Sequence, residues 1–495
     1  MQRGRVKRTM IASIIAVLML ASPAWSAIEF FGTARVMPTY YKNFDFDDDS
    51  SDQFAVNEAG LAKGEHIRAE LRLGWKAAGE KWSVKMISEA DVIMQKDTAD
   101  RSFYVGAEKD GNPNSGGEFG IERVELLYEF NPAMELETGW DVRALDIRTG
   151  GLLYGDDHPF LGFRGDLGPQ TSYELLYLPI QNMSGVTGDP FDSDEINDWR
   201  VYSLKLNQKV GGFDLSPFYA YSDNDNHEAQ VHYYGFEALR KIGMFKPSFE
   251  IVFADGEFDN GKDISSMAAF AGLELALSKA FNPYVALRYT QGDDDAADDD
   301  VEGWVGITDI GRFTPLMGMD GGIMSDDLGQ SYGASLYSYA PGRAVAGGVY
   351  QEDNYTDGLE KGADKYNSAI AEYNADLTED HYGGISNGSS GDNPGQFIAA
   401  IGAKGDLSRW VNKLSYKTQM FMIWYDETDN LNNKNSEEKV DDYAGTTFDL
   451  QLNYALDENF SLGYIFSIFV PGDGIEDQFG DDPAMINCIS MVWSY

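Results

Sequence analysis

The chain has 495 residues, a formal net charge of −43 and a single cysteine. So strong a negative charge excludes a general nucleic-acid binder, because the phosphate backbone would be repelled. One cysteine excludes an internal disulfide framework, a covalent haem site and a cysteine-rich zinc site. Aromatic residues make up 13% of the chain, which is too high a share for a disordered acidic protein.

Residues 1–26 have the three parts of a secretory signal peptide. Basic residues open the chain, an apolar run follows over residues 10–21, and Ala24 and Ser26 occupy the small-residue positions of a cleavage site. The apolar run is too short to span the roughly 30 Å of bilayer hydrocarbon. We therefore predict an exported mature chain that extends from residue 27 to residue 495.

Alternation of apolar and polar residues with a period of two dominates the mature chain. In residues 66–77, Leu71 and Leu73 point to one face and Arg72 to the other, and residues 123–130 repeat this pattern. Such alternation is typical of β-strands that have one apolar face. We count roughly 16–18 such segments of about 10 residues, in which short turns alternate with longer polar connections.

This pattern predicts an all-β fold, a transmembrane antiparallel β-barrel of about 16–18 strands with long acidic extracellular loops. A sheet crosses a bilayer only when it is closed, since each orphan backbone group would cost several kcal/mol. A soluble β-sandwich also alternates, but here one face is densely charged and the other almost purely apolar. The last strand ends at Trp493 and Tyr495, which resembles the assembly signal of bacterial outer-membrane barrels. We therefore predict a location in the outer membrane and recognition by the barrel assembly machinery.

The segment 291–395 holds 21 acidic and 4 basic residues. We interpret it as one long, mostly non-strand connection that acts as a lid or constriction, since long outer loops and lumen plugs are common in such barrels. Smaller acidic runs, such as residues 223–226, lack the glycine and distal glutamate of an EF-hand loop. We interpret them as solvated surface and predict no metal site; the alternative is that they bind Ca²⁺ or contact lipopolysaccharide through bridging divalent ions.

Charged residues at inward positions are the candidates for a pore lining. Arginine or lysine facing lipid at the membrane midplane would cost about 2–4 kcal/mol, so these side chains must face the interior. The candidate pore-lining residues are Arg68, Arg72, Lys85, Arg123, Arg143, Arg288, Lys417, Glu70, Glu125 and Asp141, and the alternation also points Arg240 and Lys413 inward. Arginine clusters would hold carboxylates and select for anions. The alternative is that each arginine is neutralised by a neighbouring glutamate.

A catalytic site finds little support in the sequence. Residues 384–388 match the G-x-S-x-G pattern, but the surrounding turn-rich residues lack the strand and helix that a nucleophile elbow needs. The histidines show no metal-ligand spacing. We predict that the protein is not an enzyme and that it has no cofactor.

Three short motifs lie near the C-terminus. They are Phe-Asp-Leu-Gln-Leu at residues 448–452, Phe-Val-Pro-Gly-Asp-Gly at 469–474 and Met-Val-Trp-Ser-Tyr at 491–495. These motifs resemble segments of the alginate-export family of outer-membrane porins. Residues 125–139 resemble a strand pair of that family, although Trp140 and Asp141 stand in place of its Arg-Gln. The resemblance implies a monomeric barrel of about 18 strands whose basic lumen passes an acidic polymer or small solutes.

The sequence as a whole predicts an outer-membrane porin. It would form a passive water-filled channel for small or anionic solutes, with an acidic polysaccharide as a further candidate. A second hypothesis stays open, in which the barrel is a sheath for a partner such as a multihaem cytochrome in an electron conduit. That partner would supply the haem. The other expected partners are outer-membrane lipid and lipopolysaccharide.

Overall fold

The computed structural model describes residues 28–42, 64–94, 117–146, 148–184, 196–224, 229–258, 261–294, 300–304, 306–307, 395–429, 439–477 and 481–495. The predicted signal peptide, the G-x-S-x-G sequence and most of the 291–395 segment lie outside these ranges. The lid role of that segment therefore stays a prediction.

The described residues form one 19-stranded sheet in which β14 has only two residues, so the wall of the barrel has 18 long strands. All neighbouring long strands are antiparallel. The strands are β1 (Glu29–Lys42), β2 (Gly64–Ala78), β3 (Trp82–Met94), β4 (Gly117–Asn131), β5 (Met134–Ala144), β6 (Gly155–Gly168), β7 (Thr171–Ser184), β8 (Ile196–Val210), β9 (Phe213–Asn224), β10 (Ala229–Arg240), β11 (Phe245–Phe258), β12 (Asp263–Leu275), β13 (Asn282–Thr290), β14 (Asp300–Val301), β15 (Gln396–Asp406), β16 (Leu414–Tyr425), β17 (Tyr443–Ala455), β18 (Phe460–Pro471) and β19 (Ala484–Ser494).

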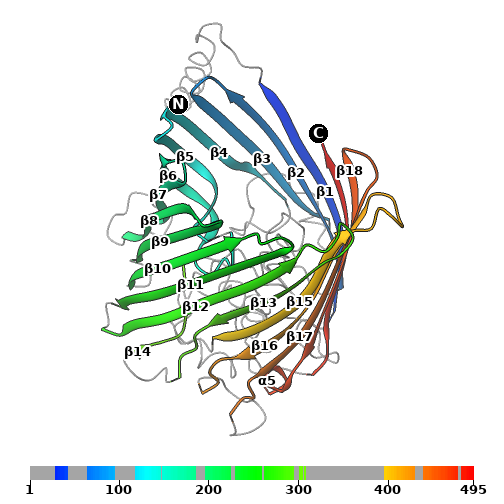
Figure 1. The fold of residues 1–495 in the computed structure, drawn as a ribbon. Coiled ribbons are helices and arrows are strands. Elements are labelled where there is room, and N and C mark those ends of the chain that lie inside the picture. The colour runs from blue at the N-terminus through cyan, green and yellow to red at the C-terminus, as the bar shows by residue number, and fades with distance from the viewer. Residues whose placement is uncertain are drawn as a thin grey trace, which may run out of the picture.

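The sheet closes on itself because β1 pairs with β2 on one side and with β19 on the other (Figure 1). At the seam, the Gly32 amide donates to the Tyr495 carbonyl at 3.2 Å and the Tyr495 amide donates to the Gly32 carbonyl at 3.1 Å. Closure leaves no strand edge with unpaired backbone groups. The predicted antiparallel barrel of about 16–18 strands is confirmed.

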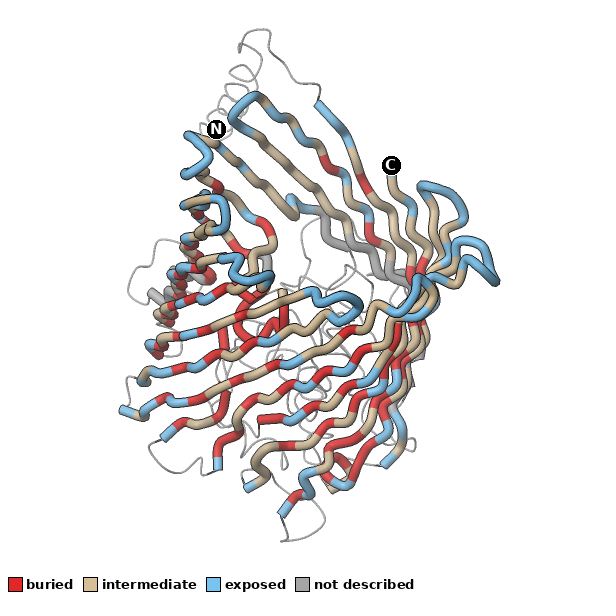
Figure 2. Tube along the Cα trace, viewed as in Figure 1, coloured by how far each residue is buried: buried red, intermediate tan, exposed pale blue. Residues whose placement is uncertain are grey.

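The exterior of the barrel is apolar. Leu71, Leu126, Leu287 and Phe253 are among its exposed large side chains, and exposed and buried positions alternate along the strands (Figure 2). The strand faces assigned from the sequence are therefore confirmed at these positions. An apolar exterior with a polar interior is the pattern of a barrel that faces lipid.

An aromatic row crosses four neighbouring strands on the same exterior. Tyr177, Tyr202, Tyr221 and His232 are register partners from β7 to β10. The Tyr177 and Tyr202 ring centroids lie 5.1 Å apart, and those of Tyr221 and His232 lie 4.8 Å apart. Aromatic rings at one height are the usual anchor at a membrane–water interface.

The two ends of the barrel differ. At one end the connections are tight turns, as between β8 and β9, where Gly211 and Gly212 have φ values of 58° and 84°. Such positive φ values favour glycine. The connections at the other end are longer, and one of them contains the four-residue helix α5 (Asp473–Glu476). No helix in the described part of the chain is long and apolar enough to cross a membrane.

One long-end connection, residues 145–154 between β5 and β6, folds into the barrel; we name it the inserted loop. The Asp146 carboxylate accepts hydrogen bonds from the Leu153 amide at 2.5 Å and the Tyr154 amide at 3.1 Å, which closes the loop on itself. Leu152, Leu153 and Tyr154 are almost completely buried.

The described start of the 291–395 segment packs on the inserted loop. Trp304 Nε1 donates to the Leu152 carbonyl at 3.2 Å, and the Ile307 amide donates to the Leu153 carbonyl at 3.0 Å. The Tyr233 hydroxyl of β10 donates to the Gly306 carbonyl at 3.2 Å. Two connections that are distant in the sequence are thereby joined against the inner wall.

Gly139 of β5 offers a test of the strand pairing. Its φ is 150°, and a Cβ added there would lie 1.8 Å from the Val124 carbonyl oxygen of β4. We expect Gly139→Ala to lower the free energy of unfolding by about 3 kcal/mol, because the backbone of β4 must move. Urea unfolding of the refolded barrel in detergent micelles measures this change. Gly120→Ala on β4 is the control, since nothing lies within 4 Å of its added Cβ. Equal unfolding midpoints would contradict the expectation.

Candidate functional site

Ionised side chains cover the inner face of β1–β6, and we name this set the charged wall. The bases are Arg35, Arg72, Lys85, Arg123, Arg143 and Arg164, and the acids are Glu70, Glu89, Glu122, Glu125, Glu135, Glu137 and Asp141. Among the described side chains, this set joins six bases and seven acids. Charge at these positions avoids lipid because strand alternation turns it inward.

Arg72 of β2 joins three strands of the charged wall. Its Nε lies 3.4 Å from Glu70 Oε1, its Nη2 lies 3.5 Å from Glu122 Oε1, and it is also paired with Glu89. Glu70 in turn lies 3.5 Å from Arg35 Nη1 on β1. A planar guanidinium suits this role because its five N–H donors point in fixed directions.

Lys85 of β3 forms the next junction. Its ammonium lies 2.8 Å from Glu125 Oε2 and 2.5 Å from Asp141 Oδ2. Arg143 Nη2 contacts the same Glu125 at 3.2 Å and Glu137 at 3.6 Å. Arg164 of β6 then lies 3.2 Å from Glu137 Oε2. The ion pairs run from β3 to β6.

A β-bulge shapes the middle of the charged wall. The register between β3 and β4 shifts between Ile87 and Ser88, which are paired with Arg123 and Ile121. Glu122, which lies between Ile121 and Arg123, has no register partner on β3. A bulge of this kind can turn two successive residues toward one face. Glu122 and Arg123 are in fact 3.5 Å apart, and Arg123 Nη1 lies 3.6 Å from Asp141 Oδ1.

The structure brings most of the candidate residues together. Seven of them, Arg72, Lys85, Arg123, Arg143, Glu70, Glu125 and Asp141, belong to the charged wall. Arg288 of β13 is buried and Lys417 of β16 is half-buried on other parts of the barrel, far along the strand order. Arg68 lies in β2, but its side chain is outside the described part of the structure.

The inward assignment of Lys413 is wrong. Lys413 lies in the turn between β15 and β16, where it is exposed, has a φ of 62° and donates from Nζ to the Leu456 carbonyl at 3.2 Å. The period-two pattern ends with the strand, so it cannot orient a residue in the turn.

Bases and acids of the charged wall differ in their exposure to water. The side chains of Lys85, Arg72 and Arg123 are 33%, 27% and 24% exposed, whereas those of Glu70, Glu137 and Asp141 are 1%, 2% and 6% exposed. The numbers of bases and acids in the charged wall are nearly equal, so the count alone does not show this difference in exposure. Arg72, Lys85 and Arg123 are therefore nearer to the water than their deeply buried acidic partners Glu70 and Asp141. The order is reversed for Arg35 and Arg143, which are 11% and 14% exposed, because Glu122, Glu125 and Glu135 are each 21% exposed.

Toward the long-loop end, the inner faces of the remaining strands carry many buried apolar side chains. Val201, Phe218, Val252, Phe270 and Phe421 are among the buried apolar residues there. The inserted loop covers part of this surface, since a Cβ added to Gly150 would lie 2.6 Å from the Cβ of Phe270. One side of the barrel is therefore charged and partly wetted, and the other side is packed.

Buried polar residues anchor the inserted loop to β8, β10 and β11. Thr149 Oγ1 lies within hydrogen-bond distance of two carboxylates, Glu237 at 3.0 Å and Glu250 at 2.5 Å, and the Gly150 amide donates to Glu250 at 2.5 Å. Lys205 pairs with Glu237 and also donates to the Leu145 carbonyl. Sequence reasoning missed this anchor. Its only visible signal is the Thr-Gly-Gly sequence that interrupts the alternation after β5.

Acidic residues crowd the long-loop end. Partial burial, followed by the negative charge of Asp426 and Asp294, raises the pKa of Glu427. The pKa of Glu476 in α5 is also raised, first by burial and then by Asp473. The described residues contain no group of three or more histidine, cysteine or acidic residues arranged to hold a metal ion.

Solved structures with this architecture are outer-membrane porins. OccAB2 of Acinetobacter baumannii has a TM-score of 0.53 at 10% identity and covers 96% of this chain and 99% of its own. OccK2 (OpdF) of Pseudomonas aeruginosa, solved in complex with glucuronate, has a TM-score of 0.52 at 11% identity and covers 94% and 97%. OpdK of the same organism, solved with vanillate, has a TM-score of 0.51 at 9% identity and covers 94% and 98%.

No family model matches the chain, and no curated protein matches it. At these identities the likeness establishes the fold, the closed barrel of bacterial outer-membrane porins. The resemblance noted in the sequence therefore holds for the barrel fold and not for the alginate-export family in particular. The fold and the apolar exterior place the chain in the bacterial outer membrane.

Arg72 tests the coupling within the charged wall. Among the described side chains, Arg72→Gln leaves the buried Glu70 carboxylate with Arg35 as its remaining ion-pair partner. We therefore expect the free energy of unfolding to fall by about 3 kcal/mol. Adding Glu70→Gln should recover most of this loss. The measurement is urea unfolding in micelles.

Lys76→Gln on the same strand is the matched control. The Lys76–Glu29 pair joins two exposed side chains, so its loss should cost less than about 1 kcal/mol. If Arg72→Gln and Lys76→Gln had the same effect, the ion pairs of the charged wall would contribute no more than surface pairs.

Proposed function

We propose that the protein is a passive outer-membrane channel for small hydrophilic solutes that carry carboxylate groups. The observation that carries this proposal is that three bases of the charged wall, Arg72, Lys85 and Arg123, are partly exposed and cover the more deeply buried acids Glu70 and Asp141. A solute that moves along this face meets positive charge first. The proposed path lies between the charged wall and the inserted loop.

The paired state of these bases would keep solute binding weak. Each base already has a carboxylate partner, so a solute carboxylate adds to or replaces an existing ion pair instead of filling an empty site. Conduction needs contacts that are favourable enough for entry and weak enough for release. The charged wall meets both needs without a conformational change.

Two structural neighbours support carboxylates as the solute class. OccK2 was solved with glucuronate and OpdK with vanillate, and both ligands carry one carboxylate. An acidic polysaccharide places a stricter requirement on the path, because a long polymer must pass the inserted loop along its whole length. We therefore propose small solutes first and a polyuronate as a test compound.

The sheath for a cytochrome is the less supported function. Residues 145–154 and 300–307 of the chain itself already cover part of the inner wall, which reduces the room for an enclosed partner. We propose outer-membrane lipid and lipopolysaccharide as the surroundings of the apolar exterior. We propose the barrel assembly machinery as a partner of β19.

Ion selectivity tests the channel proposal. Removal of two exposed bases by Lys85→Gln with Arg123→Gln should lower the chloride-to-potassium permeability ratio at least about twofold, because the buried acids remain. Reversal potentials of the refolded protein in planar bilayers give this ratio. Lys241→Gln with Lys279→Gln is the matched control, since it removes the same charge from exposed turns. A barrel without any conductance would refute the channel.

The inserted loop should limit the current. A side chain at position 150 would press on Phe270 and Glu250, so Gly150→Val should displace the loop and raise single-channel conductance by about half. Gly120→Val, with open space around its added Cβ, serves as the control. Equal conductance of the two variants would show that the loop does not constrict the path.

A further inference from the structure

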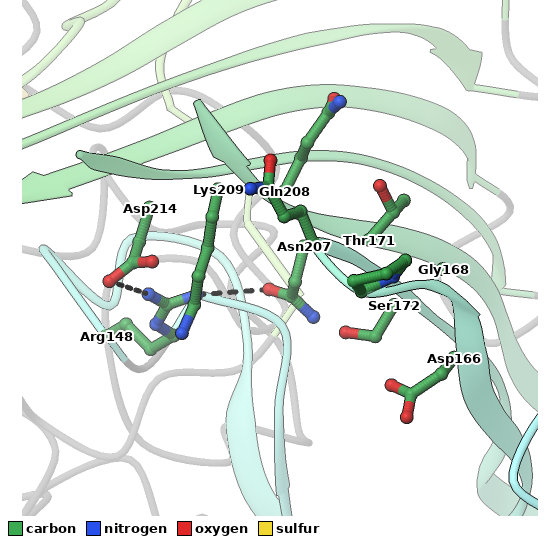
Figure 3. A pocket seen from close by; sticks show the side chains of 11 residues that line it. Arg148, Asp166, Gly168, Thr171, Ser172, Asn207, Gln208, Lys209 and Asp214 are labelled. Carbon is green, nitrogen blue, oxygen red and sulfur yellow. Dashed lines mark hydrogen bonds and ion pairs between the residues drawn. The ribbon is translucent and has the colours of Figure 1, made fainter. Parts of the chain in front are cut away.

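A cavity of about 370 Å³ lies near the short-turn end of the lumen, away from the ion pairs of the charged wall. Four neighbouring strands and the inserted loop contribute to it. Its charged and hydrogen-bonding residues include Arg148, Asp166, Ser172, Asn207, Lys209 and Asp214 (Figure 3). Pockets of this volume are large enough for a small-molecule ligand. None of these residues belongs to the predicted pore lining.

Arg148 reaches the cavity from the inserted loop. Its Nη1 donates to Asn207 Oδ1 at 3.1 Å and to Ser216 Oγ at 2.9 Å, which fixes the guanidinium against β8 and β9. Its Nη2 lies 4.0 Å from Asp214 Oδ2, too far for a hydrogen bond. In the described part of the structure, the other N–H groups of Arg148 form no hydrogen bond. A guanidinium that is fixed in position and has further N–H groups without a hydrogen bond is suited to bind a carboxylate.

One end of the cavity holds two bases, Arg148 and Lys209, together with the acid Asp214, and the other end holds the acid Asp166. Figure 3 shows Arg148 at one side of the cavity and Asp166 at the other. Lys209 is the register partner of Asp214, which places it at the Arg148 end. Neither Lys209 nor Asp166 forms an ion pair with a residue that the structure describes. Charges that the protein leaves without a partner are available to a ligand.

Neutral hydrogen-bonding groups lie between the charged ends. Asp166 is the register partner of Ser172, and Ser172 is the register partner of Asn207. Adjacent strands are about 4.8 Å apart, so the backbones of Asp166 and Asn207 are separated by roughly 10 Å. The order across the cavity is acid, hydroxyl, amide and base.

We propose that this cavity binds a zwitterion of dipeptide size. The ligand carboxylate lies on Arg148 and Lys209, its amide lies against Ser172 and Asn207, and its ammonium group faces Asp166. Two extended residues span about 7 Å, which fits within the roughly 10 Å row once hydrogen bonds are added at both ends. A single α-amino acid has its two charges on one carbon and is too short to reach both ends.

The site rests on the proposed channel function, because a solute reaches the cavity through the lumen. It differs from the charged wall in that Lys209 and Asp166 form no ion pair with a described residue, and Arg148 has only the long contact of 4.0 Å with Asp214. A solute would therefore stay bound longer in this cavity than at the charged wall, where it replaces existing ion pairs. Arg148 would determine which solutes are retained.

Three matched probes test the proposal. Glycylglycine carries a carboxylate, an amide and an ammonium group, N-acetylglycine lacks the ammonium group, and glycylglycinamide lacks the carboxylate. Isothermal titration of the purified full-length barrel in micelles should show glycylglycine binding about tenfold more tightly than either of the others. Equal binding of all three probes would overturn the proposal.

Two substitutions should remove the two preferences separately. Asp166→Asn should abolish the preference for glycylglycine over N-acetylglycine, and Arg148→Gln should abolish its preference over glycylglycinamide. Lys241→Gln, in an exposed turn, should keep both preferences. If Asp166→Asn weakened N-acetylglycine and glycylglycine equally, the ammonium assignment would be wrong. Urea unfolding of each variant confirms that the barrel is folded.

Conductance in potassium chloride separates this site from the channel itself. A barrel that conducts but shows no glycylglycine binding refutes the dipeptide site and leaves the channel. A barrel that binds glycylglycine with the expected preferences but never conducts refutes the channel and leaves the site. Binding by micelle titration requires no ion flow, so the two outcomes are independent.

Discussion

The structure depends on one constraint, which is that every backbone amide and carbonyl within a bilayer must find a partner in the protein. The chain satisfies it by pairing each long strand with two neighbours and by joining β1 to β19 at the seam. Closure then dictates where side chains point. Residues such as Leu71 and Leu126 must face lipid, and charges near the membrane midplane must face inward. The charged wall is thus a consequence of closure, because inward-facing charges on neighbouring strands lie within reach of one another.

An 18-strand barrel is too wide for its own wall side chains to fill, so its lumen is either open or occupied by other parts of the chain. In this barrel, part of the inner wall is covered by the chain and part is left uncovered. The inserted loop packs on the apolar part of the inner wall, where Gly150 allows close approach to Phe270, while β1–β6 keep ionised groups that contact water. The loop also carries Arg148 toward the short-turn end. One ten-residue connection therefore shapes both the path and the cavity below it.

The sequence predicted the strand faces well because the side-chain period of a strand is two. That period placed Arg72 opposite Leu71 and gave an interior rich in charge. It could not give the partners of Arg72, since these depend on which strands are neighbours and on their register. The bulge that brings Glu122 beside Arg123 breaks the period, and Lys413 lies beyond its end. The anchors of the inserted loop were missed because Thr149 and Gly150 follow no periodic pattern and their partners lie about 90 to 100 residues away.

The formal charge of −43 and the proposed preference for carboxylates are compatible because the charges are separated in space. Acidic residues crowd the long-loop end, where neighbouring carboxylates and burial raise the pKa of Glu427. The bases of the charged wall lie farther inside. At physiological salt the Debye length is about 8 Å, so carboxylates at the mouth are largely screened from a solute that has already entered. Inside the barrel, a solute of the proposed kind would contact the partly exposed bases directly. The local layer of Arg72, Lys85 and Arg123 would then outweigh the net charge, which acts on the approach of a solute and not on its passage.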